Sequence, residues 1–125
     1  MAAERKTIIL VDDNMTSLAA GKDILRGTYR TYPVPSADRL FELLESLRPD
    51  MILLDIEMPG MDGYGALTKL KADPQWADIP VLFITARTDT ESRDRGLALG
   101  ALDYVVKPFK AQAVLERIAA HISRT

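Results

Sequence analysis

The stretch Met-Ile-Leu-Leu-Asp-Ile-Glu-Met-Pro-Gly-Met-Asp-Gly, from Met51 to Gly63, decides the fold. Its first four residues are apolar and uncharged, a pattern typical of a strand that is buried on both faces of a sheet. The strand ends at Asp55, and Pro59 and Gly60 then predict a loop. Ligands of open parallel sheets bind beyond the carboxyl ends of the strands, so an acid in this position indicates a functional site.

Polar residues also end or follow three other predicted strands. The carboxyl ends of parallel strands meet at one edge of a sheet, so we expect these side chains to lie near Asp55. The strands and their polar residues are 7–11 with Asp12 and Asp13, 80–85 with Thr85, and 103–106 with Lys107.

Helical patterns of about a dozen residues separate the strands. This alternation predicts a doubly wound α/β fold, in which a parallel sheet carries helices on both faces. A further strand over 29–34 is interrupted by Arg30 and Pro33, which favours an edge position. The predicted helices run from Asn14 or Thr16 to about Arg26, from Ser36 to a stop at Pro49, and over about 63–72, 90–99 and 111–123.

Four motifs in a fixed order identify a family resemblance. They are Val-Asp-Asp at 11–13, Leu-Asp-Ile-x-Met-Pro-x-Met-Asp-Gly at 54–63, Phe-Ile-Thr-Ala at 83–86 and Gly-Ala-x-Asp-Tyr-x-x-Lys-Pro-Phe at 100–109. Together they resemble the CheY-like receiver domain of two-component response regulators. The resemblance covers about residues 7–122 and implies a single receiver domain over 1–125, with a flavodoxin-like fold and a five-stranded sheet in the order 2-1-3-4-5.

The composition is that of one soluble globular domain, because 125 residues are enough to bury a sizeable core. The net charge of −2 lacks the basic excess of nucleic-acid-binding proteins, so we expect no direct contact with nucleic acid. The chain has no cysteine, and no segment is long and apolar enough for a signal peptide or a membrane span. We therefore expect a cytoplasmic protein that does not bind membranes.

The acidic residues predict a magnesium site. Asp12, Asp13 and Asp55 would form an all-oxygen cluster, which suits Mg²⁺, with Mn²⁺ as a substitute. The resemblance implies that Asp13, Asp55 and the backbone carbonyl of Glu57 bind the ion directly, whereas Asp12 holds a coordinating water. The ion would offset the repulsion between the carboxylates.

The resemblance also implies phosphorylation at this site. Asp55 is expected to accept a phosphoryl group from the phosphohistidine of a sensor histidine kinase or a histidine phosphotransfer protein, and Lys107 to neutralise the phosphoryl oxygens. His121, in the last predicted helix, is expected to be solvated, so the donor histidine belongs to another protein. The domain is not expected to be an enzyme, beyond catalysing its own phosphorylation and dephosphorylation.

The same resemblance implies a conformational switch. Thr85 is expected to move toward the phosphoryl group, and Tyr104 to turn inward into the vacated space. The bond between Lys107 and Pro108 is expected to be cis, which aims the lysine at the site. The output would be a change in the surface formed by 90–99, 103–106 and 111–123, which controls a partner protein or an output domain.

Charged residues on that surface could join two copies in a homodimer on phosphorylation. However, the resemblance implies acidic residues at positions 99 and 113 in the DNA-binding transcription-factor subgroup, whereas this chain has Leu99 and Ala113 there. This difference argues against a dimer of that subgroup's type. The stretches 78–86 and 100–104 look more like receivers attached to cyclic-dinucleotide enzymes. The residues expected to make the charged contacts are Arg93, Asp103 and Arg117.

Several candidates also have a purely structural interpretation. Asp12 and Asp13 could cap the helix that follows, where acids favour the positive end of the helix dipole. Thr85 could be an ordinary strand end, and Tyr104 could be half-buried packing. Asp62 is interpreted as a structural turn residue.

Glu57 and Arg87 each lie two residues beyond a site residue. Our hypothesis is that they pair over phosphorylated Asp55 and restrict the attacking water, which lengthens the lifetime of the phosphoryl group. Exposed ion pairs contribute only about 0–1 kcal/mol to stability, so the effect would be on rate and access.

Two rival functions use similar residues. A phosphatase with an aspartyl nucleophile would have an Asp-x-Asp motif after the strand, but here the corresponding residues are Asp55-Ile-Glu57, followed by Met58-Pro59. The chain also has no insertion that could form a substrate pocket. A degenerate receiver would act only as a binding scaffold, but it would not need the complete set of site residues. That set is Asp13, Asp55, Thr85 and Lys107.

Overall fold

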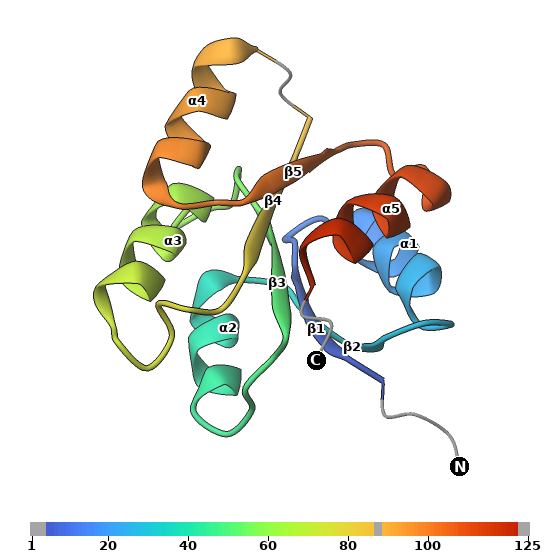
Figure 1. The fold of residues 1–125 in the computed structure, drawn as a ribbon, viewed down its shortest axis with the longest axis horizontal. Coiled ribbons are helices and arrows are strands. Elements are labelled where there is room, and N and C mark those ends of the chain that lie inside the picture. Colours follow the sequence, from blue (N-terminus) through green and yellow to red (C-terminus); the bar gives the residue numbers. More distant parts are fainter. Residues whose placement is uncertain (1–4, 87–88, 123–125) are drawn as a thin grey trace.

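The computed structural model describes residues 5–86 and 89–122, in which five strands alternate with five helices. The strands are parallel and lie in the order β2-β1-β3-β4-β5, as predicted. Helices α1 and α5 cover one face of the sheet and α2, α3 and α4 cover the other (Figure 1). The elements are β1 Thr7–Val11, α1 Met15–Leu25, β2 Arg30–Val34, α2 Ala37–Leu44, β3 Met51–Asp55, α3 Gly63–Ala72, β4 Val81–Thr85, α4 Thr90–Leu99, β5 Asp103–Val106 and α5 Ala111–His121.

The strand β3 shows why its sequence is apolar throughout. It pairs with β1 on one side and β4 on the other, and all five of its residues are buried. Ile52 and Leu54 pack under α2, α3 and α4, whereas Met51 and Leu53 pack under α1 and α5. Alternate side chains of a strand point to opposite faces, so a strand covered on both faces needs apolar residues at every position.

Four helices, α1 to α4, follow a residue whose side chain accepts a backbone hydrogen bond from the first turn, and for α4 this residue is Asp89. Asn14 accepts from the Ser17 N–H at 2.9 Å, so Asn14 rather than Asp12, Asp13 or Thr16 caps α1. Ser36 and Asp62 cap α2 and α3 in the same way. The structural interpretation of Asp62 is therefore confirmed.

Two helices end earlier than predicted. The helix predicted to stop at Pro49 is shorter in the structure, where α2 ends at Leu44. A turn follows, in which the Leu47 N–H donates to the Leu43 carbonyl at 3.0 Å and Leu47 still packs on the core. The end of α5 is at His121 rather than residue 123, which lies outside the described residues.

The strand β2 lies at the edge of the sheet, as predicted, and begins at Arg30. Pro33 has no N–H to donate, and β2 has a neighbouring strand only on the β1 side, so the proline is tolerated there. At the opposite edge of the sheet lies β5, which follows α4 and precedes α5 in the chain. Among the described residues, no helix has the length and apolar character needed to span a lipid bilayer.

Candidate functional site

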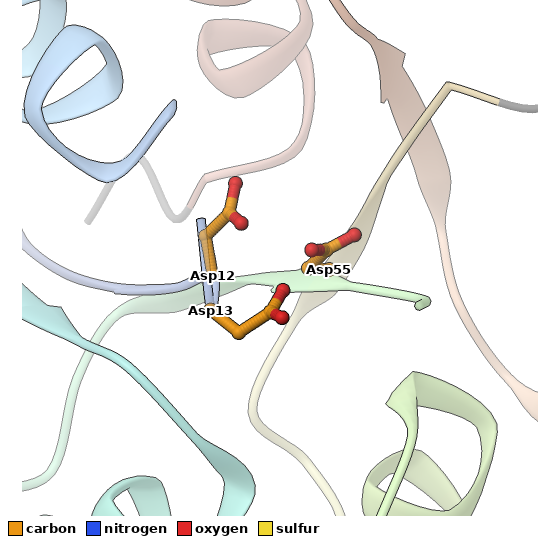
Figure 2. Close-up of side chains that lie close together, drawn as sticks. All are labelled: Asp12, Asp13 and Asp55. Atoms are coloured by element: carbon orange, nitrogen blue, oxygen red, sulfur yellow. The ribbon is translucent and has the colours of Figure 1, made fainter. Parts of the chain in front are cut away.

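Three aspartates gather at the carboxyl ends of the neighbouring strands β1 and β3. Asp12 and Asp13 follow β1, and Asp55 is the last residue of β3. One carboxylate oxygen from each lies within 4.8 Å of the other two, and Figure 2 shows the three side chains grouped at the ends of the two strands. Asp12 and Asp55 are buried, with 0% and 3% of their surface exposed, whereas Asp13 is exposed.

Lys107 follows β5 and reaches the aspartates past β4. Its Nζ lies 2.9 Å from Asp12 Oδ2 and 3.3 Å from Asp55 Oδ2. Its backbone N–H donates to the Thr85 carbonyl at 2.8 Å, and the bond to Pro108 is cis, as expected. Four segments distant in sequence therefore meet at one edge of the sheet.

The contact between Asp12 and Lys107 was not predicted. The resemblance implied that Asp12 holds a metal-bound water, which stays a prediction. In the structure its Oδ1 accepts from the Asn14 N–H at 3.0 Å and its Oδ2 pairs with Lys107. Spacing along the chain carries no signal for this pair, because the two residues are brought together by the order of the strands.

The electrostatics of the cluster are dominated by burial. The pKa of Asp55 is raised from its ordinary 3.8 to about 7. Burial is the largest cause, the hydrogen bond and charge of Asp12 add to it, and Lys107 acts against them. Burial disfavours the charged form of Lys107, but the two carboxylates outweigh it and raise the pKa of the lysine. Two buried carboxylates, Asp12 and Asp55, thus share one ammonium group, and a second cation would favour the ionised form of Asp55.

The donor set fits a magnesium ion. Within residues 5–86 and 89–122, this cluster is the only group of three acidic, histidine or cysteine side chains close enough to hold a metal. Its donors are all carboxylate oxygens, the ligands that hard cations prefer. Asp13 is exposed, which leaves the cluster open to solvent on that side.

Thr85 and Tyr104, from the neighbouring strands β4 and β5, lie close together. Thr85 is the last residue of β4 and is 3% exposed, and Tyr104 in β5 is 8% exposed. Both line a residual space of only about 10 Å³. The ring of Tyr104 is therefore packed inward, which is compatible with both the switch and the packing interpretations.

Glu57 is exposed in the loop after β3 and lines a groove of about 680 Å³ between that loop and α4. The groove is separate from the aspartate cluster, since none of the three aspartates lines it. Arg87, its predicted partner, lies outside the described residues, so the pairing stays a prediction.

His121 is not simply solvated, and that expectation is wrong. Its Nε2 lies 3.1 Å from Asp103 Oδ2, and Arg117 Nη1 donates to both oxygens of the same carboxylate at 2.9 Å. Asp103 thereby ties α5 to β5. Asp103 and Arg117, expected to act across a dimer, have partners within the chain, and the guanidinium of the third such residue, Arg93, lies over the ring of Tyr104.

Comparison with known proteins decides the family. The family model described as the response regulator receiver domain matches residues 8–119. The chain belongs to the response regulator receiver family. The receiver is 35% identical over 99% of its length to the DNA-binding response regulator MtrA of Mycolicibacterium smegmatis, and it covers 54% of that protein.

Two further relatives give the range of proteins that contain similar receivers. The receiver is 35% identical to a probable cyclic di-GMP phosphodiesterase of Vibrio cholerae over 93% of its own length and 26% of that protein. It is 34% identical to the receiver domain of a sensor histidine kinase of Pseudomonas aeruginosa, whose crystal structure has a magnesium ion coordinated in the active site cleft. That match has a TM-score of 0.80 and covers 91% of this receiver and 93% of that chain. The receiver thus spans about half or less of the two longer relatives.

Proposed function

We propose that this receiver accepts a phosphoryl group on Asp55 from the phosphohistidine of a sensor histidine kinase or a histidine phosphotransfer protein, in a magnesium-dependent reaction. The observation that carries the proposal is the position of Lys107 Nζ, 3.3 Å from Asp55 Oδ2 and at the same edge as Asp12 and Asp13. A lone buried acid would stay protonated, whereas this one has a cation beside it and a site for another.

In the transfer, an Asp55 oxygen attacks the phosphorus while the bond between phosphorus and the donor imidazole nitrogen breaks. The electron pair of that bond returns to the imidazole, and the product is an acyl phosphate on Asp55. Lys107 is placed to neutralise the phosphoryl oxygens, and the Thr85 hydroxyl to donate to one of them. Asp55 must be ionised to attack, which burial opposes and Lys107 favours.

Asp13 and Asp55, together with the backbone carbonyl of Glu57, would hold Mg²⁺, with Asp12 acting through a water and Mn²⁺ as a substitute. When bound, the ion supplies positive charge that offsets the repulsion between the carboxylates and the incoming phosphate. The magnesium in the Pseudomonas aeruginosa relative supports this assignment.

We further propose that phosphorylation changes the surface of α4, β5 and α5, which controls a partner protein or an output domain. Tyr104, packed between Thr85 and α4, is placed to carry the change. The relatives join similar receivers to a DNA-binding regulator and a probable phosphodiesterase, so either kind of output is compatible with this chain. With a sensor histidine kinase or phosphotransfer protein as the donor, we also propose that the protein acts in the cytoplasm.

The proposal treats the domain as a signalling module that catalyses only its own phosphorylation and dephosphorylation. Glu57 and Arg87 are proposed to lengthen the lifetime of the acyl phosphate. An Arg87→Ala variant should lose its phosphoryl group faster than the wild type, and an unchanged rate of dephosphorylation would contradict this role.

Intact-mass measurement tests the proposed function. Wild-type protein incubated with magnesium and acetyl phosphate should gain about 80 Da, the mass of one phosphoryl group, and Asp55→Asn should not. Omitting magnesium should abolish the gain. If no adduct forms and beryllofluoride does not bind either, the scaffold function is favoured, and turnover of small phosphate esters would instead favour the phosphatase.

A further inference from the structure

Helix α4 is attached to the domain by few apolar side chains. Gly96 is its only buried residue, and the glycine lies so close to the ring of Phe83 that an added Cβ would come within 2.8 Å. Leu97 is 44% exposed. Two arginines make the remaining ring contacts: the guanidinium of Arg93 lies 4.4 Å from the centre of the Tyr104 ring, and that of Arg95 lies 4.0 Å from the centre of the Tyr64 ring.

The two tyrosines differ in what else holds them. The Tyr64 hydroxyl donates to the Ser92 carbonyl at 3.2 Å, and its ring packs edge-on against Phe83 at 5.5 Å. The Tyr104 hydroxyl is buried and has no hydrogen-bond partner among the described residues. No polar contact of its own therefore fixes the orientation of Tyr104, which depends on packing and on Arg93.

Arg93 is an exposed residue that lies over a buried ring. The ring, Arg93 and Thr85 all line the same residual space of about 10 Å³. Tyr104 is thus buried where the end of β4 meets α4, with the Arg93 guanidinium over its ring. A ring turned outward from this space would leave the position over which Arg93 lies, so the contact belongs to the inward orientation.

We propose that Arg93 is a positioning residue for Tyr104, whose guanidinium holds the ring inward and couples its orientation to α4. A guanidinium over an aromatic face is attracted to it, and a contact made in only one orientation favours that orientation. At an exposed site the attraction corresponds to roughly a two- to fivefold shift in the ratio of inward to outward rings. Its link to signalling rests on the proposed function, whereas the contact itself does not need phosphorylation.

The chain offers a matched control on the same helix. Arg93→Ala removes the contact with Tyr104, and Arg95→Ala removes the equivalent contact with Tyr64. Arg93→Lys keeps a cation that can lie over the ring but loses the planar guanidinium. Tyr29, which is 8% exposed, and Tyr32, which is 38% exposed, are internal references for buried and exposed rings.

The experiment is NMR of the metal-free protein labelled on its tyrosine rings, with Tyr104→Phe used for assignment. The nuclear Overhauser effect between the Tyr104 ring and the Thr85 methyl reports the inward orientation. Broadening by a soluble nitroxide reports exposure. In Arg93→Ala we expect the outward fraction to rise roughly two- to fivefold, with a weaker Overhauser effect and with broadening shifted toward that of Tyr32. Arg93→Lys should restore part of the effect, and Arg95→Ala should leave Tyr104 unchanged.

Two results would overturn the proposal. If Arg93→Ala raises the broadening but leaves the Overhauser effect intact, Arg93 only covers the ring. If Arg95→Ala changes Tyr104 as much as Arg93→Ala does, the effect belongs to α4 as a whole. Adding magnesium and beryllofluoride should return Tyr104 inward in Arg93→Ala. A wild type that does not bind beryllofluoride would contradict the proposed function, while the metal-free comparison would still decide the role of Arg93.

Discussion

The Asp55 carboxyl is close to half-protonated at neutral pH in the metal-free protein, because burial, followed by Asp12, raises its pKa to about 7. The same carboxyl must be ionised to attack a phosphoryl group. Asp55 therefore needs cations beside it to ionise and react at neutral pH. Lys107 supplies one of them at 3.3 Å.

Asp55→Asn should reveal this in the pH dependence of stability. In the metal-free protein, the folded state keeps the Asp55 proton up to about pH 7, whereas the unfolded chain loses it near 3.8. The stabilising contribution of the protonated carboxyl is complete below the unfolded pKa and is lost as the pH rises through the folded one. We expect the variant to exceed the wild type in free energy of unfolding by about 2–4 kcal/mol at alkaline pH and by little at acidic pH.

Urea unfolding in EDTA across this pH range measures the difference. Asp13→Asn is the matched control, because Asp13 belongs to the same cluster but is exposed, so its effect should be much smaller. Equal stabilities of the wild type and Asp55→Asn at every pH would show that the buried carboxyl does not titrate in this way.

Lys107→Met should slow phosphoryl transfer. The substitution keeps much of the side-chain length and removes the ammonium that lies beside Asp12 and Asp55. Loss of one preoriented cation or donor at a transferring group costs about 10²–10³ in rate. The rate of mass gain with acetyl phosphate measures the effect, and Lys107→Arg, which keeps the charge, should lie between the two. An unchanged rate in Lys107→Met would remove the lysine from the mechanism.

At the scale of elements, the loop from β3 to α3 is held directly against the site. The Gly63 N–H donates to the Ile56 carbonyl at 2.8 Å, and a Cβ on Gly63 would clash with the Asp55 carbonyl and come within 2.7 Å of the Ile56 Cα. These are backbone atoms, so they cannot move without shifting Asp55. Glycine is therefore required where α3 begins.

Gly63→Ala should both destabilise the domain and weaken the site. We expect a loss of about 1–3 kcal/mol in the free energy of unfolding, as for other overpacked positions, together with a lower affinity for magnesium. Gly27→Ala is the control, because an added Cβ there meets no atom within 4 Å and should change stability by no more than about 1 kcal/mol. Urea unfolding measures the stability of both variants, and magnesium titration measures their affinity for the ion. Equal stability and equal magnesium affinity in Gly63→Ala and Gly27→Ala would contradict the prediction.

At the scale of the whole molecule, the sheet order places the acidic edge and the proposed output surface close together. β3 is central, and β4 and β5 lie beyond it in turn (Figure 1). Tyr104 in β5 contacts α4, and Lys107, directly after β5, contacts Asp55. A charge change at Asp55 can thus act on α4 and α5 through the two neighbouring strands β4 and β5.

Magnesium should raise the melting temperature of the wild type. A ligand that binds only the folded state stabilises it by about 2.7 kcal/mol at one hundred times its dissociation constant. The variant Asp13→Ala, which lacks one proposed ligand, should gain much less. Scanning calorimetry with sodium chloride at matched ionic strength separates site binding from screening, and an equal shift from sodium chloride would argue against a specific site.

Local pattern accounts for the elements of this fold. The uniformly apolar run of β3, the proline of the edge strand β2 and the caps Asn14, Ser36 and Asp62 depend on neighbours along the chain, so they can be recognised without coordinates. The gathering of Asp12, Asp13, Asp55, Thr85 and Lys107 follows too, because parallel strands end at the same edge.

Only the tertiary structure decided which polar and aromatic side chains contact one another. Only the packed structure pairs Lys107 with Asp12, turns His121 onto Asp103 and lays Arg93 over Tyr104. It also buries Asp12 while its neighbour Asp13 stays exposed. These contacts join side chains that are distant in sequence, and burial strengthens their electrostatic interactions, so their partners and their pKa values depend on the three-dimensional packing rather than on spacing along the chain.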